Sequence, residues 1–88
     1  MGLQLTNSNK LARTKWACRR GMLELDCIFN DFLKSGYEQL TESQKDDFLV
    51  FLGNIDPDLY SWLMGFRQAE EEADKLMVKI IRDAIDLL

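Results

Sequence analysis

Apolar side chains recur at intervals of three and four residues along this 88-residue chain, and short polar or glycine-containing breaks separate the runs. This spacing places apolar side chains on one face of an α-helix. No stretch alternates β-branched and polar residues over the length of a strand. The pattern therefore predicts an all-α protein, a single domain over residues 1–88. Because the breaks are short, we expect a compact five-helix antiparallel bundle.

The first predicted helix begins at Ser8 or Asn9, either of which can serve as its N-cap, and ends at Arg19. Residues 1–8 are expected to form a flexible polar lead. Helical spacing places the following residues on or beside one face: Leu11, Ala12, Lys15, Trp16 and Cys18.

The second predicted helix runs from Met22 to Lys34 and carries the clearest apolar stripe. Gly21, just before it, suits the left-handed C′ position that ends many helices, and Gly36 is expected to end the second helix. The stripe that should face the core consists of Leu25, Ile28, Phe29, Phe32 and Leu33.

The third predicted helix has the most specific start signal in the chain. Thr41-Glu42-Ser43-Gln44 fits a capping box, in which the Thr41 hydroxyl and the Gln44 side chain each satisfy an N–H at the helix end. Gly53-Asn54 should end this helix. Its apolar side comprises Phe48, Leu49, Phe51 and Leu52.

The fourth predicted helix begins with Asp56 as its cap and Pro57 at its first position, and Gly65 closes it. Trp62, in this helix, is open to two interpretations: with its aromatic neighbours Tyr60 and Phe66 it could be an exposed anchor for a partner, or it could belong to the core.

The fifth predicted helix runs from Ala69 to Leu87, and a solvated acidic run occupies its first turns. Acidic side chains there are favourable because they oppose the helix dipole. The apolar residues with helical spacing are Ala73, Leu76, Met77, Ile80, Ile81, Ala84, Ile85 and Leu88.

Charge is distributed unevenly along the chain. Eleven basic and fifteen acidic residues give a net charge of −4, but residues 1–20 carry five basic residues and no acid. An acidic protein is not expected to bind nucleic acid, although the basic first helix keeps that alternative open. The basic end could instead meet an acidic protein surface. With no apolar run long enough to cross a bilayer and no signal region, we expect a cytoplasmic protein without membrane insertion.

The residue inventory argues against enzymatic activity. The chain has no histidine, no glycine-rich phosphate loop, and two cysteines, Cys18 and Cys27, that we expect to be reduced and structural. Two thiols make a poor zinc site, so no metal is predicted. Glu24 and Asp26 point about 200° apart on a helix and cannot converge on one reacting atom.

The segment Arg20-Gly21-x-x-Glu24 between the first two helices is the candidate site. One interpretation is structural: Arg19 and Arg20 suit the end of the first helix, Glu24 and Asp26 suit the start of the second, and Arg20 can pair locally with Glu24. The other is functional: the tight junction presents a guanidinium and a carboxylate as a rigid docking patch, because arginine binds carboxylates bidentately at protein interfaces.

Two stretches resemble a known family. Trp16-Ala-Cys-Arg-Arg-Gly-Met-Leu-Glu-Leu-Asp26 is similar to the Arg-Gly-x-x-Glu signature of the succinate dehydrogenase flavinylation factors, the SdhE-type FAD assembly factors. Asp56-Pro-Asp-Leu-Tyr-Ser-Trp-Leu63 resembles that family's second recognisable stretch. The likeness extends from about Asn9 to Ile85.

This resemblance implies an assembly factor that promotes covalent FAD attachment to the flavoprotein subunit of succinate dehydrogenase, and in bacteria also of fumarate reductase. It implies that FAD is the group attached to the partner, whose own histidine accepts it, and we expect no cofactor to be held stably here. The partner-binding residues become Arg19, Arg20, Gly21, Glu24 and Asp26. Mitochondrial members carry a targeting extension, which is not recognised in this sequence, so we expect a bacterial member. We also expect it to act as a monomer. The alternative is a small helical adaptor or antitoxin-like protein that binds an unrelated partner.

Overall fold

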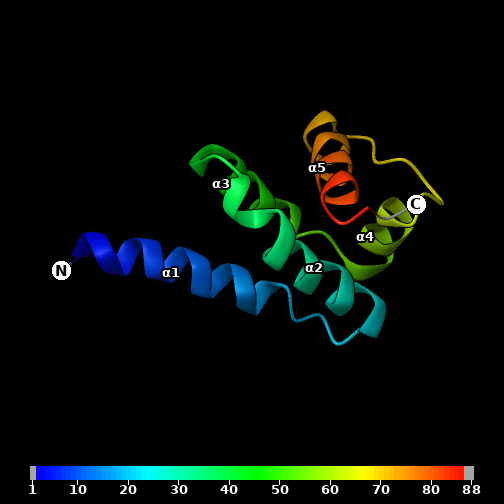
Figure 1. Cartoon of the computed structure of the whole chain (residues 1–88). Coiled ribbons are helices and arrows are strands. Elements are labelled where there is room, and N and C mark those ends of the chain that lie inside the picture. The colour runs from blue at the N-terminus through cyan, green and yellow to red at the C-terminus, as the bar shows by residue number, and fades with distance from the viewer. Residues whose placement is uncertain (1, 87–88) are drawn as a thin grey trace.

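In the computed structural model, the backbone is described for residues 2–86 and the side chains for residues 9–86. Within this described part there are helices and no strand, so the predicted five-helix all-α class is confirmed (Figure 1). None of the described helices is both long and apolar enough to cross a membrane. The elements are α1 (Gly2–Ala17), α2 (Leu23–Ser35), η1 (Tyr37–Gln39, a 3₁₀ turn), α3 (Glu42–Phe51), α4 (Asp56–Leu63) and α5 (Glu72–Ala84).

The core is built around α2, which packs against α4 and α5, while α5 also packs against α3 and α4. Phe48 of α3 lies at its centre and is fully buried. Its ring centroid is 5.1 Å from that of Phe32, 6.0 Å from Tyr37 and 6.1 Å from Phe29. The predicted stripe of α2 is confirmed at Leu25, Ile28, Phe29 and Phe32, whereas Leu33 is only partly buried.

Helix α1 lies beside this body, and its N-terminal half projects past it (Figure 1). It begins at Gly2, before the predicted start, and ends at Ala17 rather than Arg19. Its buried contacts come from Thr14, whose hydroxyl donates to the carbonyl of Lys10 at 2.8 Å, and from Cys18 just beyond the helix. Trp16 was expected beside the apolar face, but 73% of it is exposed. The predicted flexibility of residues 1–8 stays a prediction.

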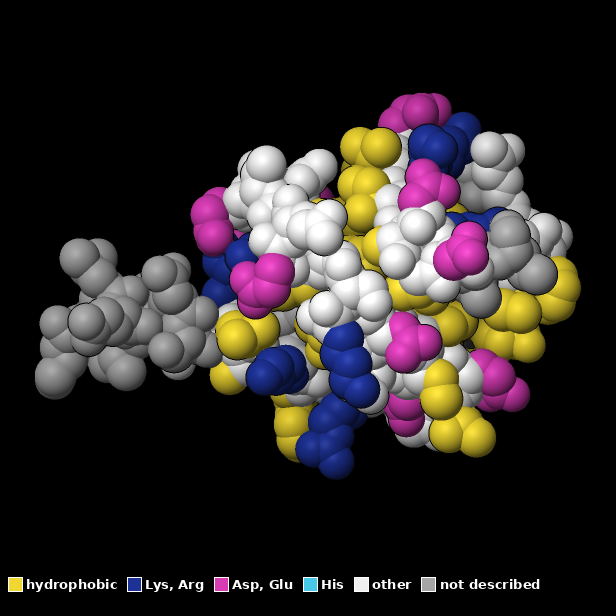
Figure 2. Space-filling model, in the orientation of Figure 1, with side chains coloured by type: hydrophobic (Ala, Val, Ile, Leu, Met, Phe, Trp, Pro, Cys, Tyr) yellow, Lys and Arg dark blue, Asp and Glu magenta, His cyan; other side chains and the backbone are white. Residues whose placement is uncertain are grey.

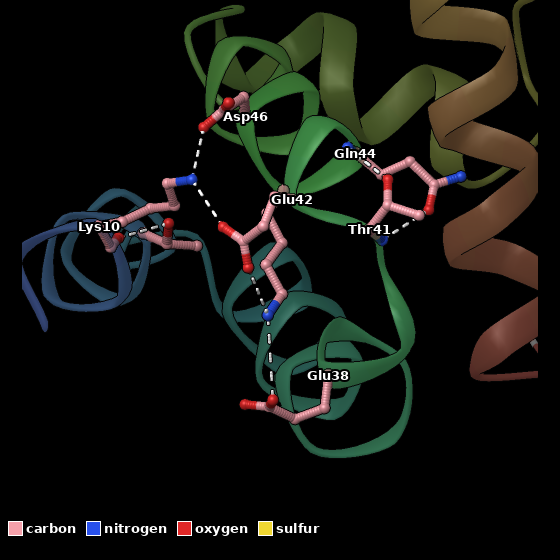
Figure 3. Close-up of polar contacts among 8 residues, drawn as sticks. Lys10, Glu38, Thr41, Glu42, Gln44 and Asp46 are labelled. Carbon is pink, nitrogen blue, oxygen red and sulfur yellow. Dashed lines mark hydrogen bonds and ion pairs between the residues drawn. The ribbon is translucent and has the colours of Figure 1, made fainter. Parts of the chain in front are cut away.

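Ion pairs join α1 to α3. The Lys10 ammonium lies 2.9 Å from carboxylate oxygens of both Asp46 and Glu42 (Figure 3). The hydrogen bond to Asp46, with a further one to Glu42, raises the pKa of Lys10, and the bond from Lys10 lowers the pKa of Glu42. The capping box at the start of α3 is confirmed: Thr41 Oγ1 accepts from the Gln44 N–H at 3.1 Å, and Gln44 Oε1 accepts from the Thr41 N–H at 2.9 Å.

Helix α4 begins differently from the prediction and ends as expected. Ile55 is its N-cap, and Asp56 is already inside the helix. At the other end Gly65 has φ +81°, and its N–H donates to the Trp62 carbonyl at 3.2 Å. The Phe66 N–H donates to Ser61 at 2.8 Å, which completes a Schellman motif. Trp62 is buried and so belongs to the core, whereas its neighbour Phe66 is 70% exposed.

Helix α5 is shorter than the predicted Ala69–Leu87. It begins at Glu72, because the backbone of its N-cap Glu71 is extended, and it ends at Ala84; Ala69, before the helix, is buried. Leu87 and Leu88 lie outside the described residues. Met77 and Ile81 carry its buried contacts.

Candidate functional site

Arg20 fixes the junction between α1 and α2 from the inside. Its Nε donates to Asp56 Oδ1 at 2.7 Å, and one terminal nitrogen donates to the carbonyls of Leu52 at 2.7 Å and Ala17 at 2.9 Å. The other terminal nitrogen donates to the Asn54 carbonyl at 2.9 Å. Only 17% of the Arg20 side chain is exposed. One guanidinium therefore ties the end of α1 to the loop between α3 and α4.

The backbone of the junction is held as well. The Arg20 N–H donates to Asp26 Oδ1 at 2.8 Å, so a side chain in the first turn of α2 fixes the approaching chain. Gly21 then adopts φ +82°, the left-handed conformation that favours glycine, but it lies beyond the end of α1 and is not the predicted C′ residue. A Cβ atom built on Gly21 would meet nothing within 4 Å. The glycine thus faces open space.

Other side chains of the junction point outward. Arg19 and Glu24 are exposed, and Leu23 is 74% exposed. The Arg19 guanidinium lies 5.7 Å from the ring centroid of the exposed Trp16. Figure 2 shows basic and hydrophobic side chains gathered near the end of α1. We call Trp16, Arg19, Gly21, Leu23 and Glu24 the junction surface.

The predicted local ion pair between Arg20 and Glu24 is wrong. Arg20 pairs with Asp56 instead, because its side chain turns toward the α3–α4 loop while Glu24 remains exposed. The structure thus divides the five candidate residues into an inner pair, Arg20 and Asp26, and an outer group, Arg19, Gly21 and Glu24. Their role in binding a partner stays a prediction.

The acceptors of Arg20 were missed by sequence reasoning. Asp56 is 36 residues from Arg20, and its own position suggested a helix cap. The carbonyls of Leu52 and Asn54 carry no signal in a sequence, since every residue has one. A signal that could have been used was the arginine itself, whose five donors need acceptors wherever it is buried.

Cys18 lies beneath the junction and Cys27 on the surface of α2. Burial raises the pKa of the Cys18 thiol to about 12, although the nearby Arg20 partly opposes the shift. Cys18 is therefore a protonated core thiol, as predicted, whereas Cys27 is exposed and does not serve the core. Among the described residues no group of three or more potential ligand side chains is placed to hold a metal ion.

The junction is a fixed surface with exposed charged and apolar groups. An exposed cation, anion and leucine flank Gly21 in the chain, and the backbone there is fixed by Arg20 and Asp26. A surface fixed before binding loses little conformational entropy when a partner docks.

Comparison with known proteins places the chain in a family. Residues 12–85 match the family described as "Flavinator of succinate dehydrogenase", and the chain belongs to this family. Relatives are called "FAD assembly factor SdhE". The one from Vibrio cholerae is 52% identical over 59 residues, which cover 67% of this chain and 69% of the relative. Another, from Aliivibrio fischeri, is 41% identical over 83 residues, or 93% of this chain and 96% of the relative. The relative from Photobacterium profundum is 42% identical over 76 residues, 86% of each chain. No solved structure matches the chain significantly.

Proposed function

We propose that this member of the flavinator family promotes covalent attachment of FAD to the flavoprotein subunit of succinate dehydrogenase, and that it does so by binding that subunit through the junction surface. The family description and the names of the relatives support the assembly role. We further propose that the flavoprotein of fumarate reductase is a second partner, and that the chain works as a cytoplasmic monomer that holds no cofactor of its own.

The observation that carries the binding mode is the contrast between Arg20 and Gly21. Arg20 has four of its five side-chain donors bonded within the chain, whereas the Cβ position of Gly21 is open. Arg20 is thus assigned the positioning of the loop, and Asp26 assists it. Contact with the partner is assigned to Arg19, Gly21 and Glu24, the members of the motif that face solvent.

The helper contributes geometry to the reaction. The chain contains no histidine, so the side chain that accepts the flavin must come from the partner, as the family resemblance implies. Binding at the junction surface would hold the partner in a conformation in which its histidine and the flavin methyl group meet. Such orientation lowers a barrier by about 7–11 kcal/mol in ideal cases.

The test mixes purified apo-flavoprotein subunit, FAD and this chain, and measures the acid-stable flavin fluorescence of the subunit on a denaturing gel. Gly21→Arg should abolish the stimulation, because its side chain projects into the space that the partner needs. Gly21→Ala is the matched control, since it shares the strain of a positive φ, about 1–2 kcal/mol, without the bulk. It should keep most of the stimulation.

Two results would contradict the proposal. One is full stimulation by a folded Gly21→Arg variant. The other is that the wild-type chain captures a different protein in a complex that lacks the flavoprotein subunit. That result would favour the adaptor interpretation.

A further inference from the structure

A second feature adjoins the junction surface. The end of α1 and the outer side of α2 enclose a groove of about 600 Å³. Arg19 belongs both to this groove and to the junction surface, so the two are continuous. We call it the α1–α2 groove, and its walls include Lys15, Cys18, Arg19, Asp26, Leu33 and Lys34.

The cations of the groove have no ion-pair partner among the residues whose side chains the structure describes, a condition that they share with the exposed Arg13 of α1. Lys15, Arg19 and Lys34 are exposed and form no ion pair with any residue whose side chain the structure describes. Six other basic residues have a carboxylate within 4 Å: Lys10, Arg20, Lys45, Arg67, Lys75 and Lys79. In a chain with more acids than bases, three neighbouring cations are left without a counter-charge.

Asp26 is the one carboxylate among the groove residues, and it is already engaged. Its Oδ1 accepts the Arg20 N–H at 2.8 Å, and the residue is only partly exposed. Three cations and one anion leave the groove with a formal charge of +2. The buried Cys18 and the half-buried Leu33 give it an apolar floor between the charged side chains. Arg19 is also partly ordered by its stacking over Trp16, which leaves its N–H groups available.

A larger hollow of about 780 Å³ between the α4–α5 loop and α5 offers a comparison. It is also lined by basic residues, but Arg67 is paired with Asp58, Lys75 with Glu72 at 3.2 Å, and Lys79 with Asp83 at 3.2 Å. Arg82, the remaining cation there, also has a partner within the chain. The residues lining that hollow also sum to +2, but each of its cations is engaged within the chain, unlike those of the α1–α2 groove.

We propose that the α1–α2 groove binds an acidic segment of the partner polypeptide, with carboxylates on Lys15, Arg19 and Lys34 and an apolar side chain against Leu33. This inference rests on the proposed function and specifies the chemistry of the surface that meets this chain. A polypeptide fits better than a free phosphate compound, because the cations are spread along two helices and the groove is continuous with the junction surface. The charges also attract the partner at a distance, which raises the rate of association at low salt.

The test uses a charge reversal and a matched control. Lys15→Glu/Lys34→Glu reverses two groove cations, and Lys75→Glu/Lys79→Glu makes the same change in net charge on α5. Affinity for the apo-flavoprotein subunit is measured by titration calorimetry over a series of salt concentrations. At low salt the groove variant should bind about tenfold more weakly or worse, and its affinity should no longer fall as salt rises, because like charges then face one another and salt screens their repulsion. The control should remain within about twofold.

A zero-length carbodiimide crosslink of the wild-type complex gives a second measurement. It should join Lys15 or Lys34 to aspartate or glutamate residues of one segment of the partner, which mass spectrometry identifies.

Gly21→Arg separates the two proposals. If Gly21→Arg abolishes binding and the groove variant binds normally, the groove proposal fails and the proposed function stands. If both variants bind normally, both proposals fail. If the groove variant loses affinity for pyrophosphate but not for the flavoprotein, the occupant is a phosphate compound and the proposal is overturned.

Discussion

Replacing Arg20 by alanine should destabilise the fold, because this residue joins two distant parts of the chain. Its guanidinium donates to Asp56 and to three carbonyl oxygens, those of Ala17, Leu52 and Asn54. Alanine removes every one of these donors and leaves the acceptors facing a small cavity. The end of α1 would lose its polar connection to the α3–α4 loop.

The magnitude follows from the burial of the contacts. Breaking a buried charged pair costs about 3–5 kcal/mol. Because 17% of the Arg20 side chain and 31% of the Asp56 side chain are exposed, water can replace part of the lost hydrogen bonding. We therefore expect a loss of about 3 kcal/mol in the free energy of unfolding. A domain of this size has a total of roughly 4–13 kcal/mol. The corresponding decrease in melting temperature is roughly 12–24 °C.

Thermal unfolding followed by circular dichroism measures this change, with urea unfolding as a second measurement. Arg19→Ala is the matched control, because the contact of its guanidinium with a described side chain is the exposed one with Trp16, worth about 0.5–1 kcal/mol. Arg20→Lys should recover about half of the loss, since an ammonium cannot serve acceptors spread around a planar fork. If Arg20→Ala melts within about 3 °C of the wild type, the guanidinium is not the connection that we describe.

The remaining predictions concern the thiols, the core and a helix cap. At pH 8, native protein should react with a thiol reagent at Cys27 only, and unfolding should expose Cys18 as a second thiol. Because burial raises the pKa of Cys18 from 9.0 to about 12, its contribution to stability is complete below pH 9 and falls as pH rises toward 12, by about 1.4 kcal/mol per unit. Cys18→Ala should flatten this part of a urea-unfolding pH series. Phe48→Ala should cost about 3–5 kcal/mol in the same assay, since its ring is fully buried. Thr41→Ala should cost about 1 kcal/mol through loss of the capping box, and an unchanged urea midpoint would refute that role.

The fold could be predicted wherever a local signal determines the local structure. The capping box at Thr41, the stripe of α2 and the positive φ of Gly65 each depend on residues within a few positions of one another. Prediction failed where a distant contact decided the outcome. Asp56 has the side chain of a helix cap, but Arg20 draws its carboxylate away, and Ile55 takes the N-cap position without a side-chain bond.

The same limit applies to the site. Sequence reasoning located the junction and its five candidate residues, because two charged pairs around a glycine stand out between helical patterns. It could not tell which side chains face inward, since the acceptors of Arg20 lie in another part of the chain. For Trp16 the helical spacing was misleading. The side of α1 that packs against the rest of the chain is set by Thr14 and by Cys18 just beyond the helix, and Trp16 is left exposed.

The inner and outer roles within one motif lead to a test that no single substitution provides. Arg20→Ala should reduce both stability and partner binding, because the loop loses its support, whereas Gly21→Arg should reduce binding with little further loss of stability beyond the strain of its positive φ. If Arg20 acts only by positioning the junction surface, the weak binding that Gly21→Arg retains no longer depends on that surface, and adding Arg20→Ala should not reduce it further. The double variant should then bind no more weakly than Gly21→Arg alone, while its stability falls below that of Gly21→Arg. Additive losses of binding would mean that Arg20 contacts the partner directly.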